Sequence, residues 1–310
     1  EVDVVISGHT HQSYICQVAT TDSTRTLLLT SAGQYGTLLT HVRLSINVQS
    51  GKVVRKSADN LIVQGEAFDR GGQVVALRSD FPVFPKDPTV AALIERYAAA
   101  AAPLSQRVVG RLGSPMTRRP SASRESTLGN LIADAQLAAT QSLGRGGAQI
   151  AFMNPGGVRA DLVPAADGSV TYGQLFSTQP FGNSLVVKTL TGAQLRRLLE
   201  QQFASGTNTV AAPRVLYPSV GFSYACDLSK PEGARISDLR LRGAEVAEAG
   251  QYRVAMNSFL AAGGDNFSVL LEGVDAAGGG QDVDAFEEYI QSRSTSTPVM
   301  PPALDRIVVR

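Results

Sequence analysis

Two histidines one residue apart, His9 and His11, are the first side chains along the chain whose spacing could support chemistry. They follow the apolar run Val2–Ile6, which predicts a short strand that ends just before them. Residues i and i+2 of an extended segment share a face, so both imidazoles could face one metal ion or two neighbouring ions, with Gly8 allowing the backbone to turn. Zinc-type sites need three or four protein ligands. The pair alone is therefore compatible both with metal ligation and with two buried or solvated histidines.

The remaining histidine and the two cysteines do not complete such a site by spacing. His41 alternates with Val42 and Leu44 in a strand-like run, which favours a structural role for this histidine. Cys16 and Cys226 lie far apart in the sequence and allow one disulfide at most, and the sequence leaves open whether it forms.

The composition indicates a globular protein that is long enough for two domains. The chain has 310 residues, of which 43% are hydrophobic and 18% charged, and its formal net charge is +1. This charge gives no indication of a nucleic-acid or anionic-membrane partner. Since no apolar stretch reaches 18 residues, no transmembrane segment is expected. The chain starts with Glu1 and leads directly into a core-like strand, so we expect a fragment or a processed product.

The patterning divides the chain into three parts, residues 1–80, 81–104 and 105–310. The first part has short apolar runs broken by glycines, as expected for the closing strands of a β-sheet. In the second, Asp87 and Pro88 predict the start of a connector helix that runs to residue 102. The third alternates helices and strands: a helix that begins at Ser126 or Thr127, a helix opened by a Thr191–Gln194 capping box, and strands at 149–153, 184–189 and 252–256.

Three turns in the third part combine polar, aromatic and glycine residues, and we expect them directly after strands, where ligands bind in α/β folds. They are Asn154–Arg159 (NPGGVR), Gln179–Asn183 (QPFGN) and Asn257–Asp265 (NSFLAAGGD). Two phenylalanines and a carboxylate would suit a planar heterocycle joined to a hydroxylated sugar, through stacking and hydrogen bonding. Each turn alone is also compatible with an ordinary surface turn or a core anchor.

Taken together, these motifs resemble the 5′-nucleotidase family of two-domain metallophosphoesterases. The family's second domain carries an ES-x-LGNLI-x-DA helix start, an N-x-GG-[IV]-R loop, a PFGN turn followed by a helix, and an F-L-A-x-GGD loop. These match Glu125–Ala135, Asn154–Arg159, Pro180–Asn183 and Phe259–Asp265, in the same order. The resemblance implies a mixed α/β fold, in which a C-terminal substrate-binding domain follows the terminal strands of a metallophosphoesterase β-sandwich and a linker helix.

The resemblance also implies roles for single residues. His9 and His11 match the GHTH segment that contributes to a site for two divalent metals, which could be Zn, Mn, Fe or Co. Asn154 and Arg159 resemble residues that hold the substrate near its phosphate and ribose. Phe181 and Phe259 resemble the pair of aromatic residues that stack on either side of the nucleobase. Asp265 resembles the acidic residue that binds the ribose hydroxyls. Arg124 is a weaker match to a substrate-binding arginine.

Several family features are absent from this sequence. The Asp-x-His, Gly-Asp and Gly-Asn-His segments that supply the other metal ligands and the acid-base histidine do not occur, so we expect no catalytic residue in this chain and an inactive fragment. Pro155 replaces a frequent glycine and removes one backbone donor.

The reaction that the resemblance implies is hydrolysis of nucleoside 5′-monophosphates by a periplasmic, secreted or cell-surface protein, with this chain recognising the nucleotide and its domains rotating about the linker helix. The alternatives are a relative acting on cyclic nucleotides, UDP-sugars or sulfur esters, and a catalytically silent nucleotide-binding module.

Overall fold

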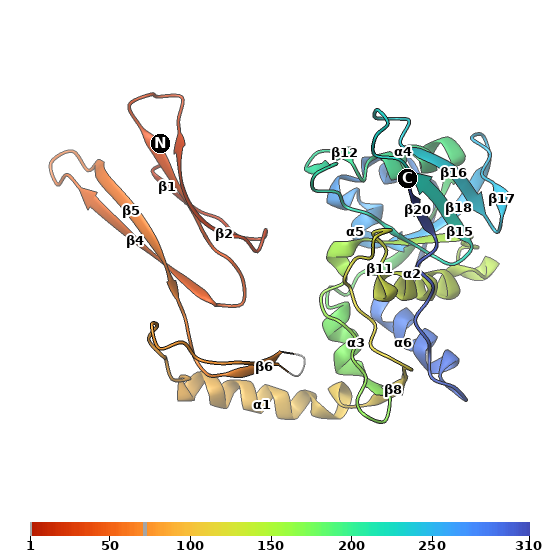
Figure 1. Cartoon of the computed structure of the whole chain (residues 1–310), viewed down its shortest axis with the longest axis horizontal. Helices are drawn as coiled ribbons and strands as arrows, with labels where there is room; N and C mark the ends of the chain where they lie inside the picture. Colours follow the sequence, from red (N-terminus) through yellow and green to blue (C-terminus); the bar gives the residue numbers. More distant parts are fainter. Residues whose placement is uncertain (1, 71–72) are drawn as a thin grey trace. The chain divides into compact units, whose positions relative to one another are not determined.

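The computed structural model describes residues 2–70 and 73–310, and it divides into two compact units. Unit 1 comprises Glu1–Ala98 and unit 2 comprises Ala99–Arg310. Figure 1 shows unit 1 in red and orange, and unit 2 in colours from yellow to blue. The boundary falls inside one helix, α1 (Pro88–Ser105), and each unit is described separately below.

Unit 1 consists of small β-sheets. A three-stranded sheet has the order β1-β3-β2, and two hairpins pair β4 with β5 and β6 with β7. The strands are β1 (Val4–Ile6), β2 (Ser13–Ala19), β3 (Thr26–Ala32), β4 (Leu38–Ile46), β5 (Val53–Ile62), β6 (Phe68–Arg70) and β7 (Gln73–Val75). The sequence pattern predicted strand-like runs up to about residue 63, such as those now seen as β3 and β4, separated by glycine turns, as at Gly33 and Gly51, whose backbones are left-handed. Strands β6 and β7 lie beyond that predicted region.

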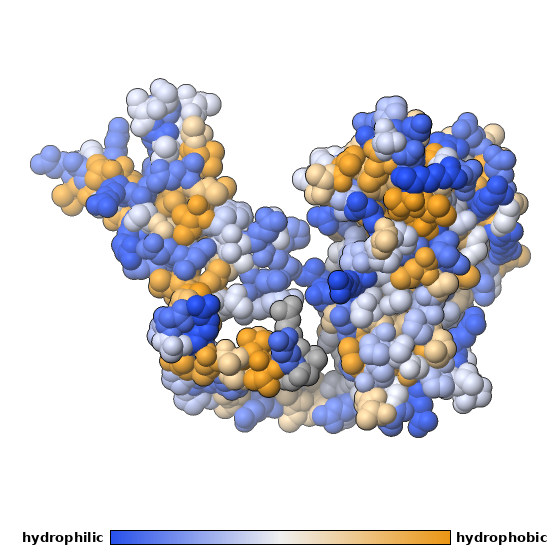
Figure 2. Space-filling view, viewed as in Figure 1, coloured by the Kyte–Doolittle hydropathy of each residue, from blue (hydrophilic) through white to orange (hydrophobic). Residues whose placement is uncertain are grey.

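Much of the apolar surface of unit 1 is exposed. Leu39, Ile46 and Val54 are each more than half exposed although they lie in the β4–β5 hairpin. Figure 2 shows hydrophobic residues at the surface of this unit, interspersed with hydrophilic ones. Leu28 in β3 is buried, so the hydrophobic core of unit 1 lies in the three-stranded sheet.

Helix α1 begins where the sequence predicted. The Asp87 carboxylate accepts hydrogen bonds from the backbone N–H groups of Thr89 (2.8 Å) and Val90 (3.0 Å), and Pro88 is the first helical residue. The helix ends three residues later than expected, at Ser105, with Pro103 inside its last turn. None of its residues is buried. In the described part of the chain, no helix is long and apolar enough to cross a bilayer.

Unit 2 is a mixed α/β body. Its helices are α2 (Thr127–Thr140), α3 (Tyr172–Thr178), α4 (Gly192–Glu200), α5 (Ser258–Ala261) and α6 (Asp282–Arg293). Its longer strands are β8 (Val108–Arg111), β9 (Ile150–Met153), β11 (Ser184–Thr191), β15 (Phe222–Cys226), β16 (Ile236–Leu241), β18 (Gln251–Asn257) and β19 (Val274–Gln281). The shorter ones are β10 (Ser169–Thr171), β12 (Ala204–Ser205), β13 (Asn208–Thr209), β14 (Tyr217–Pro218), β17 (Ala244–Glu245) and β20 (Ile307–Val309).

A five-stranded sheet of order β14-β9-β18-β11-β19 forms the centre of unit 2. Strands β9 and β18 are parallel, whereas β11 is antiparallel to both β18 and β19. Successive residues of β9 enter different core clusters, because side chains alternate between the two faces of a strand. Ile150 and Phe152 pack in the cluster that includes α4, and Ala151 and Met153 face the other side, where α2 packs.

A second sheet of order β17-β16-β15-β20 adds the residues Phe222 and Ile236 to the same core as α4. Helices cover both faces of the central sheet, so its middle strands are buried on both sides. The fold is the mixed α/β arrangement that the resemblance implied.

The helix starts agree with the capping residues predicted from the sequence. Ser126 caps α2, and its hydroxyl accepts a hydrogen bond from the Gly129 N–H. Thr191 and Gln194 form the predicted capping box of α4. A second capping box, Thr171 with Gln174, opens α3 and was not predicted.

Candidate functional site

The topology of the central sheet brings the three candidate turns to one edge. Asn154 follows the C-terminal end of β9, and Asn257 ends the parallel neighbour β18. Strand β11 runs in the opposite direction, and its Leu185 pairs with Asn257, so the turn that precedes β11 lies at the same edge. Two expectations about this turn are wrong: QPFGN follows helix α3 and not a strand, and it leads into strand β11 and not into a helix.

A chain of side-chain hydrogen bonds joins the first turn to the third. The Asn257 amide N–H donates to Asn154 Oδ1 (2.9 Å), and the Asn154 amide N–H donates to Asp265 Oδ2 (2.8 Å). Asn257 Oδ1 in turn accepts from the Leu260 N–H (2.9 Å). Asn154 and Asn257 are only 3% and 1% exposed, so both amides are fixed in orientation by buried partners. This network sets the position of the Asp265 carboxylate.

Two further contacts hold Asp265 in place. Its Oδ1 lies 3.3 Å from a guanidinium nitrogen of Arg214, and its backbone carbonyl accepts a hydrogen bond from Asn208 Nδ2 (2.8 Å). The backbone of Asp265 is left-handed (φ 54°), as is that of the preceding Gly263 (φ 80°). A left-handed aspartate costs conformational energy, and such strain is concentrated at functional sites. The carboxylate is thus a fixed hydrogen-bond acceptor next to a cation.

The arginine of the first turn packs against the aromatic residue of the second. The Arg159 guanidinium carbon lies 5.6 Å from the centre of the Phe181 ring, a cation–π distance, and the backbone N–H of Arg159 donates to the backbone carbonyl of Thr178 (2.9 Å). Phe181 itself is 56% exposed. An aromatic ring that is held at its base and exposed to this extent can stack on a planar ligand.

The phenylalanine of the third turn is held by a glycine. A Cβ on Gly264 would lie only 2.5 Å from the Phe259 ring, so the ring packs directly on the bare backbone at this position. Phe259 is 45% exposed. The GGD sequence therefore has two local functions: Gly264 accommodates the ring, and Gly263 provides the left-handed bend before Asp265.

Asn183 links the second turn to its neighbours. Its Oδ1 accepts a hydrogen bond from the Ser258 hydroxyl (3.3 Å), and its amide donates to Asp282 Oδ2 (3.3 Å) at the start of α6. Burial raises the pKa of the Asp282 carboxyl, although the bond from Asn183 acts in the opposite direction. All three turns are thus joined by hydrogen bonds or ring contacts at one edge of the sheet.

The structure gives the Glu125–Ala135 motif a structural role. Buried Glu125 accepts hydrogen bonds from the N–H groups of Arg306 (3.2 Å) and Ile307 (3.1 Å), and so anchors the last strand, β20. Burial raises the pKa of the Cys226 thiol, and the charge of nearby Arg124 offsets a small part of this rise. The Arg124 side chain takes no part in the hydrogen bonds and ion pairs that join the candidate residues of the three turns.

The two N-terminal histidines lie in a turn, not in the extended segment that the sequence analysis expected. His9 (φ 69°) and His11 (φ 62°) both have left-handed backbones and exposed side chains, so the i, i+2 rule for strands does not apply to them. Within residues 2–70 and 73–310, no group of three or more His, Cys, Asp or Glu residues could hold a metal ion. Two histidines are fewer ligands than a metal site of this kind needs, so these residues do not form one by themselves.

Sequence reasoning placed Asn257 in the third candidate turn without giving it a role, and it missed Arg214 and Asn208 as parts of the site. Asn257 is the last residue of β18 and the N-cap of α5. Because asparagine is a favoured N-cap residue, this position could have been identified from the sequence. Asn208 lies in the two-residue strand β13 and Arg214 in an irregular segment, and the position of both depends on the tertiary fold. His41 is exposed on β4, and both cysteines are free, Cys16 exposed and Cys226 buried.

The described geometry agrees with similarities to known proteins. Residues 103–272, more than half of the chain, match the family profile of the 5′-nucleotidase C-terminal domain. The trifunctional nucleotide phosphoesterase YfkN of Bacillus subtilis is 29% identical over 87% of this chain, and a probable 5′-nucleotidase of Treponema pallidum is 27% identical over 72% of it. The chain spans 17% and 40% of the lengths of these two curated relatives.

A solved structure shows the same likeness over nearly all of the chain. The crystal structure of a 5′-nucleotidase precursor from Thermus thermophilus is 26% identical, with a TM-score of 0.70, and the match covers 99% of this chain and 59% of the other. The family profile, the relatives and the mixed α/β fold agree. The chain belongs to the 5′-nucleotidase family.

Proposed function

We propose that this chain provides the nucleotide-recognition part of a metal-dependent phosphoric ester hydrolase that cleaves nucleoside 5′-monophosphates. The observation that carries the proposal is the convergence of two half-exposed rings, Phe181 and Phe259, and a fixed carboxylate, Asp265, at one edge of the central sheet. A nucleoside offers a flat base for the rings and vicinal hydroxyls for the carboxylate.

In this proposal each group has a separate task. The rings of Phe181 and Phe259 stack on the base, a contact that accepts any base because every base has a π-face. Asp265 accepts hydrogen bonds from the ribose hydroxyls, while Asn154 holds the carboxylate in position. Arg159 lies on Phe181, where its planar guanidinium can also donate to the phosphate. Arg124 remains a weaker candidate because its side chain takes no part in the contacts that join the three turns.

The proposed hydrolysis requires two divalent ions, to which this chain would contribute His9 and His11. In such sites the ions polarise the phosphate and activate a water molecule. The described residues do not complete this site, and none of them is proposed as the acid-base residue. We therefore expect the 310-residue chain alone to hydrolyse no AMP.

We also place the whole protein outside the cytoplasm, in the periplasm, in the secreted fraction or at the cell surface. This proposal rests on relatives, one of which is a cell wall protein of Listeria monocytogenes that is 30% identical over 57% of this chain. Neither nucleic acid nor a membrane span is part of the proposal.

Calorimetry with adenosine tests the base sandwich. The double variant Phe181→Ala, Phe259→Ala is expected to weaken adenosine binding at least tenfold, because each stacked base contributes roughly 1–3 kcal/mol. Phe84→Ala is the matched control, since Phe84 is half exposed but lies in unit 1. If the double variant binds adenosine as well as the wild type does, the base-sandwich assignment is wrong.

A second titration tests the sugar contact independently. The wild type should bind adenosine more tightly than 2′,3′-dideoxyadenosine, and Asp265→Asn should reduce this preference, because an amide is a weaker acceptor for two hydroxyls. An unchanged preference in Asp265→Asn would remove Asp265 from the ribose site but leave the stacking proposal intact.

A second candidate function is hydrolysis of cyclic nucleotides or UDP-sugars by the same family site. It is favoured by the 29% identity to a relative described as a trifunctional nucleotide phosphoesterase. Base and ribose contacts are common to all of these substrates, so assays of the whole protein with AMP, cyclic AMP and a UDP-sugar separate the two candidates. A whole protein that binds adenosine but hydrolyses none of the three would instead be a silent binding module.

A further inference from the structure

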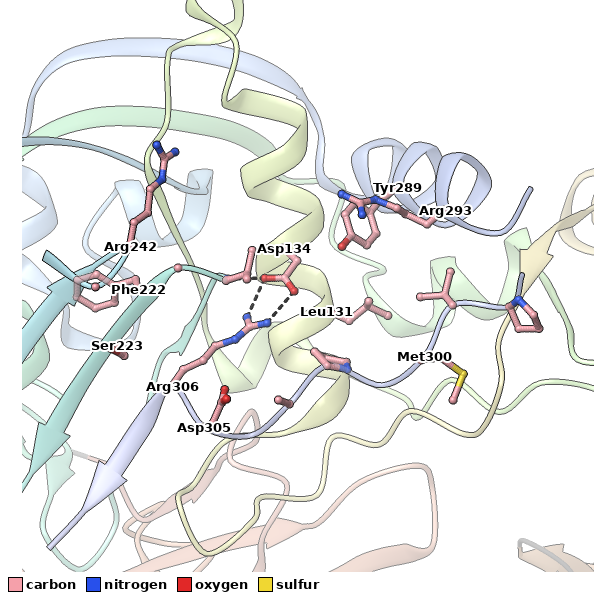
Figure 3. A pocket seen from close by; sticks show the side chains of 17 residues that line it. Leu131, Asp134, Phe222, Ser223, Arg242, Tyr289, Arg293, Met300, Asp305 and Arg306 are labelled. Carbon is pink, nitrogen blue, oxygen red and sulfur yellow. Dashed lines mark hydrogen bonds and ion pairs between the residues drawn. The ribbon is translucent and has the colours of Figure 1, made fainter. Parts of the chain in front are cut away.

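Unit 2 contains a hollow that shares no lining residue with the three turns of the proposed nucleotide site. Its volume is about 710 Å³, within the range of small-molecule sites. Helices α2 and α6, the strand β15, the β16–β17 turn and the segment 298–306 surround it, as Figure 3 shows. The charged residues that line it are three arginines and two aspartates, which leaves one excess positive charge.

One of the arginines is fully engaged at the base of the hollow. Arg306 donates to both carboxylate oxygens of Asp134 at 2.8 Å, and one of its nitrogens also donates to the Pro218 carbonyl (2.7 Å). Both side chains of the pair are 8% exposed. This pair neutralises itself. The remaining charged lining residues are Arg242, Arg293 and the exposed Asp305, so the two arginines outweigh this one carboxylate by a single positive charge.

Those two arginines lie on opposite sides of the hollow. In Figure 3, Arg242 stands on one side and Arg293 on the other, with the Asp134–Arg306 pair between them. Both residues are exposed, and in the described part of the chain neither guanidinium has a hydrogen bond or an ion pair. Several other arginines of unit 2, such as Arg107 and Arg197, pair with a glutamate.

The position of Arg242 is conformationally costly. It forms, with Gly243, the two-residue turn between β16 and β17, and both residues have left-handed backbones (φ 52° and 82°). Asparagine, aspartate or glycine is the residue type that such a turn favours at its first position. An arginine there is strained, and strain of this kind is often retained for function.

The stem of this arginine lies beside Gly221. A Cβ on Gly221 would lie 3.6 Å from Arg242 Cγ, and the Gly221 carbonyl accepts a hydrogen bond from the Arg242 N–H (2.6 Å). The aliphatic stem of Arg242 therefore runs along the bare backbone at the edge of the hollow.

Arg293 on the other side is held by an aromatic ring. Its guanidinium carbon lies 5.2 Å from the centre of the Tyr289 ring. A stacked guanidinium keeps its in-plane N–H donors available for an anion. Burial raises the pKa of the Tyr289 hydroxyl, which therefore stays protonated as a donor at neutral pH. The exposed side chains of Val220 and Met300 form an apolar part of the wall of the hollow.

We propose that this hollow binds a small extended polyanion, a phosphate chain or a polycarboxylate, held between Arg242 and Arg293. Guanidinium groups bind both kinds of oxyanion through paired hydrogen bonds, and two of them on opposite sides select a ligand with more than one negative group. The site is separate from the proposed nucleotide site, so the two proposals can fail independently.

Calorimetric titration of the 310-residue chain with inorganic tripolyphosphate and, separately, with citrate tests the proposal. We expect one of the two to bind with a dissociation constant below about 1 mM that weakens as salt is added. Binding of tripolyphosphate alone identifies a phosphate chain as the ligand, and binding of citrate alone identifies a polycarboxylate. Saturating adenosine should not displace either probe. Failure of both probes to bind would overturn the proposal.

Arg242→Asn separates a binding role from a role in the turn. Asparagine suits the left-handed position, so this variant should melt at the same or a higher temperature than the wild type. Its affinity for the probe should nevertheless fall at least tenfold, as should that of Arg293→Gln. Arg240→Gln is the matched control, because Arg240 is an exposed arginine of the same hairpin outside the lining of the hollow. Equal affinity in Arg242→Asn and the wild type, or an equal loss in Arg240→Gln, would contradict the proposal.

Discussion

At the residue scale, the candidate site consists of side chains that are oriented by other side chains. Asn154 has its amide bound on both sides, by Asn257 and by Asp265, so it cannot rotate without breaking a buried hydrogen bond. In the proposed function its task is to hold Asp265 as much as to contact the substrate. Pre-organised groups of this kind lower the entropy cost of ligand binding.

The two cysteines illustrate how strongly surroundings change one residue type. Burial, with a contribution from nearby Glu200, raises the pKa of Cys226 to about 11. At pH 8 only about one thousandth of such a thiol is thiolate, and the reactive fraction rises about tenfold per pH unit until the pKa is reached. We expect iodoacetamide to label exposed Cys16 within minutes at pH 8 and to leave Cys226 unmodified.

Mass spectrometry of the intact native chain measures this labelling, and a sample in 6 M guanidinium should take up two labels. The Cys16→Ser variant should take up none in the native state at pH 8. Rapid native labelling of Cys226 in that variant would show that the thiol is neither buried nor protonated as described.

At the element scale, the loops at the sheet edge depend on particular glycines. A Cβ on Gly157 would lie 2.4 Å from Met153 Cε and 2.9 Å from Asn154 Oδ1, whereas one on Gly156 would have only ordinary contacts of 3.6 Å or more. The two adjacent glycines of the NPGGVR loop therefore have different constraints. Gly157 is needed for packing beneath Asn154, whereas the position of Gly156 can accommodate a Cβ.

This difference gives a matched pair of variants. Gly157→Ala is expected to shift Asn154 and to weaken adenosine binding at least tenfold, because the Asn154–Asp265 bond would be disturbed. Gly156→Ala should bind adenosine within about threefold of the wild type, since its Cβ makes no close contact. Calorimetry of both variants is the measurement, and the assignment fails if Gly156→Ala has the larger effect.

The elements of unit 2 were more predictable from the sequence than the connections between them. Capping residues such as Ser126 and Thr191 fix helix starts locally, and they were found where predicted. The contacts of Asp265 with Arg214 and Asn208 depend on how separate strands pair, and no local pattern encodes that. The same limit explains His9 and His11: their spacing suggested a strand, but the chain turns there, in a conformation that local propensity does not favour.

At the scale of the whole molecule, the C-terminal end of unit 2 is bound to its N-terminal part, because the segment that leads into the last strand forms an ion pair with helix α2. Strand β20 lies parallel to β15, and its preceding residue Arg306 pairs with Asp134 of α2, 172 positions earlier in the chain. Asp134 Oδ1 also accepts a hydrogen bond from the Val220 N–H (2.6 Å). Because the pair is buried, each charge depends on the other to offset its loss of hydration.

We therefore expect Arg306→Met to lower the free energy of unfolding of unit 2 by about 3–5 kcal/mol, because it leaves the Asp134 carboxylate buried without its partner. The double variant Asp134→Leu, Arg306→Met should lose less than Arg306→Met alone, since it removes both charges. Arg43→Met is the control: its ion pair with Asp59 is more than half exposed and lies in unit 1, so little should change. Urea denaturation followed by circular dichroism measures all three. A loss below about 1 kcal/mol in Arg306→Met would show that the C-terminal strand does not depend on this pair.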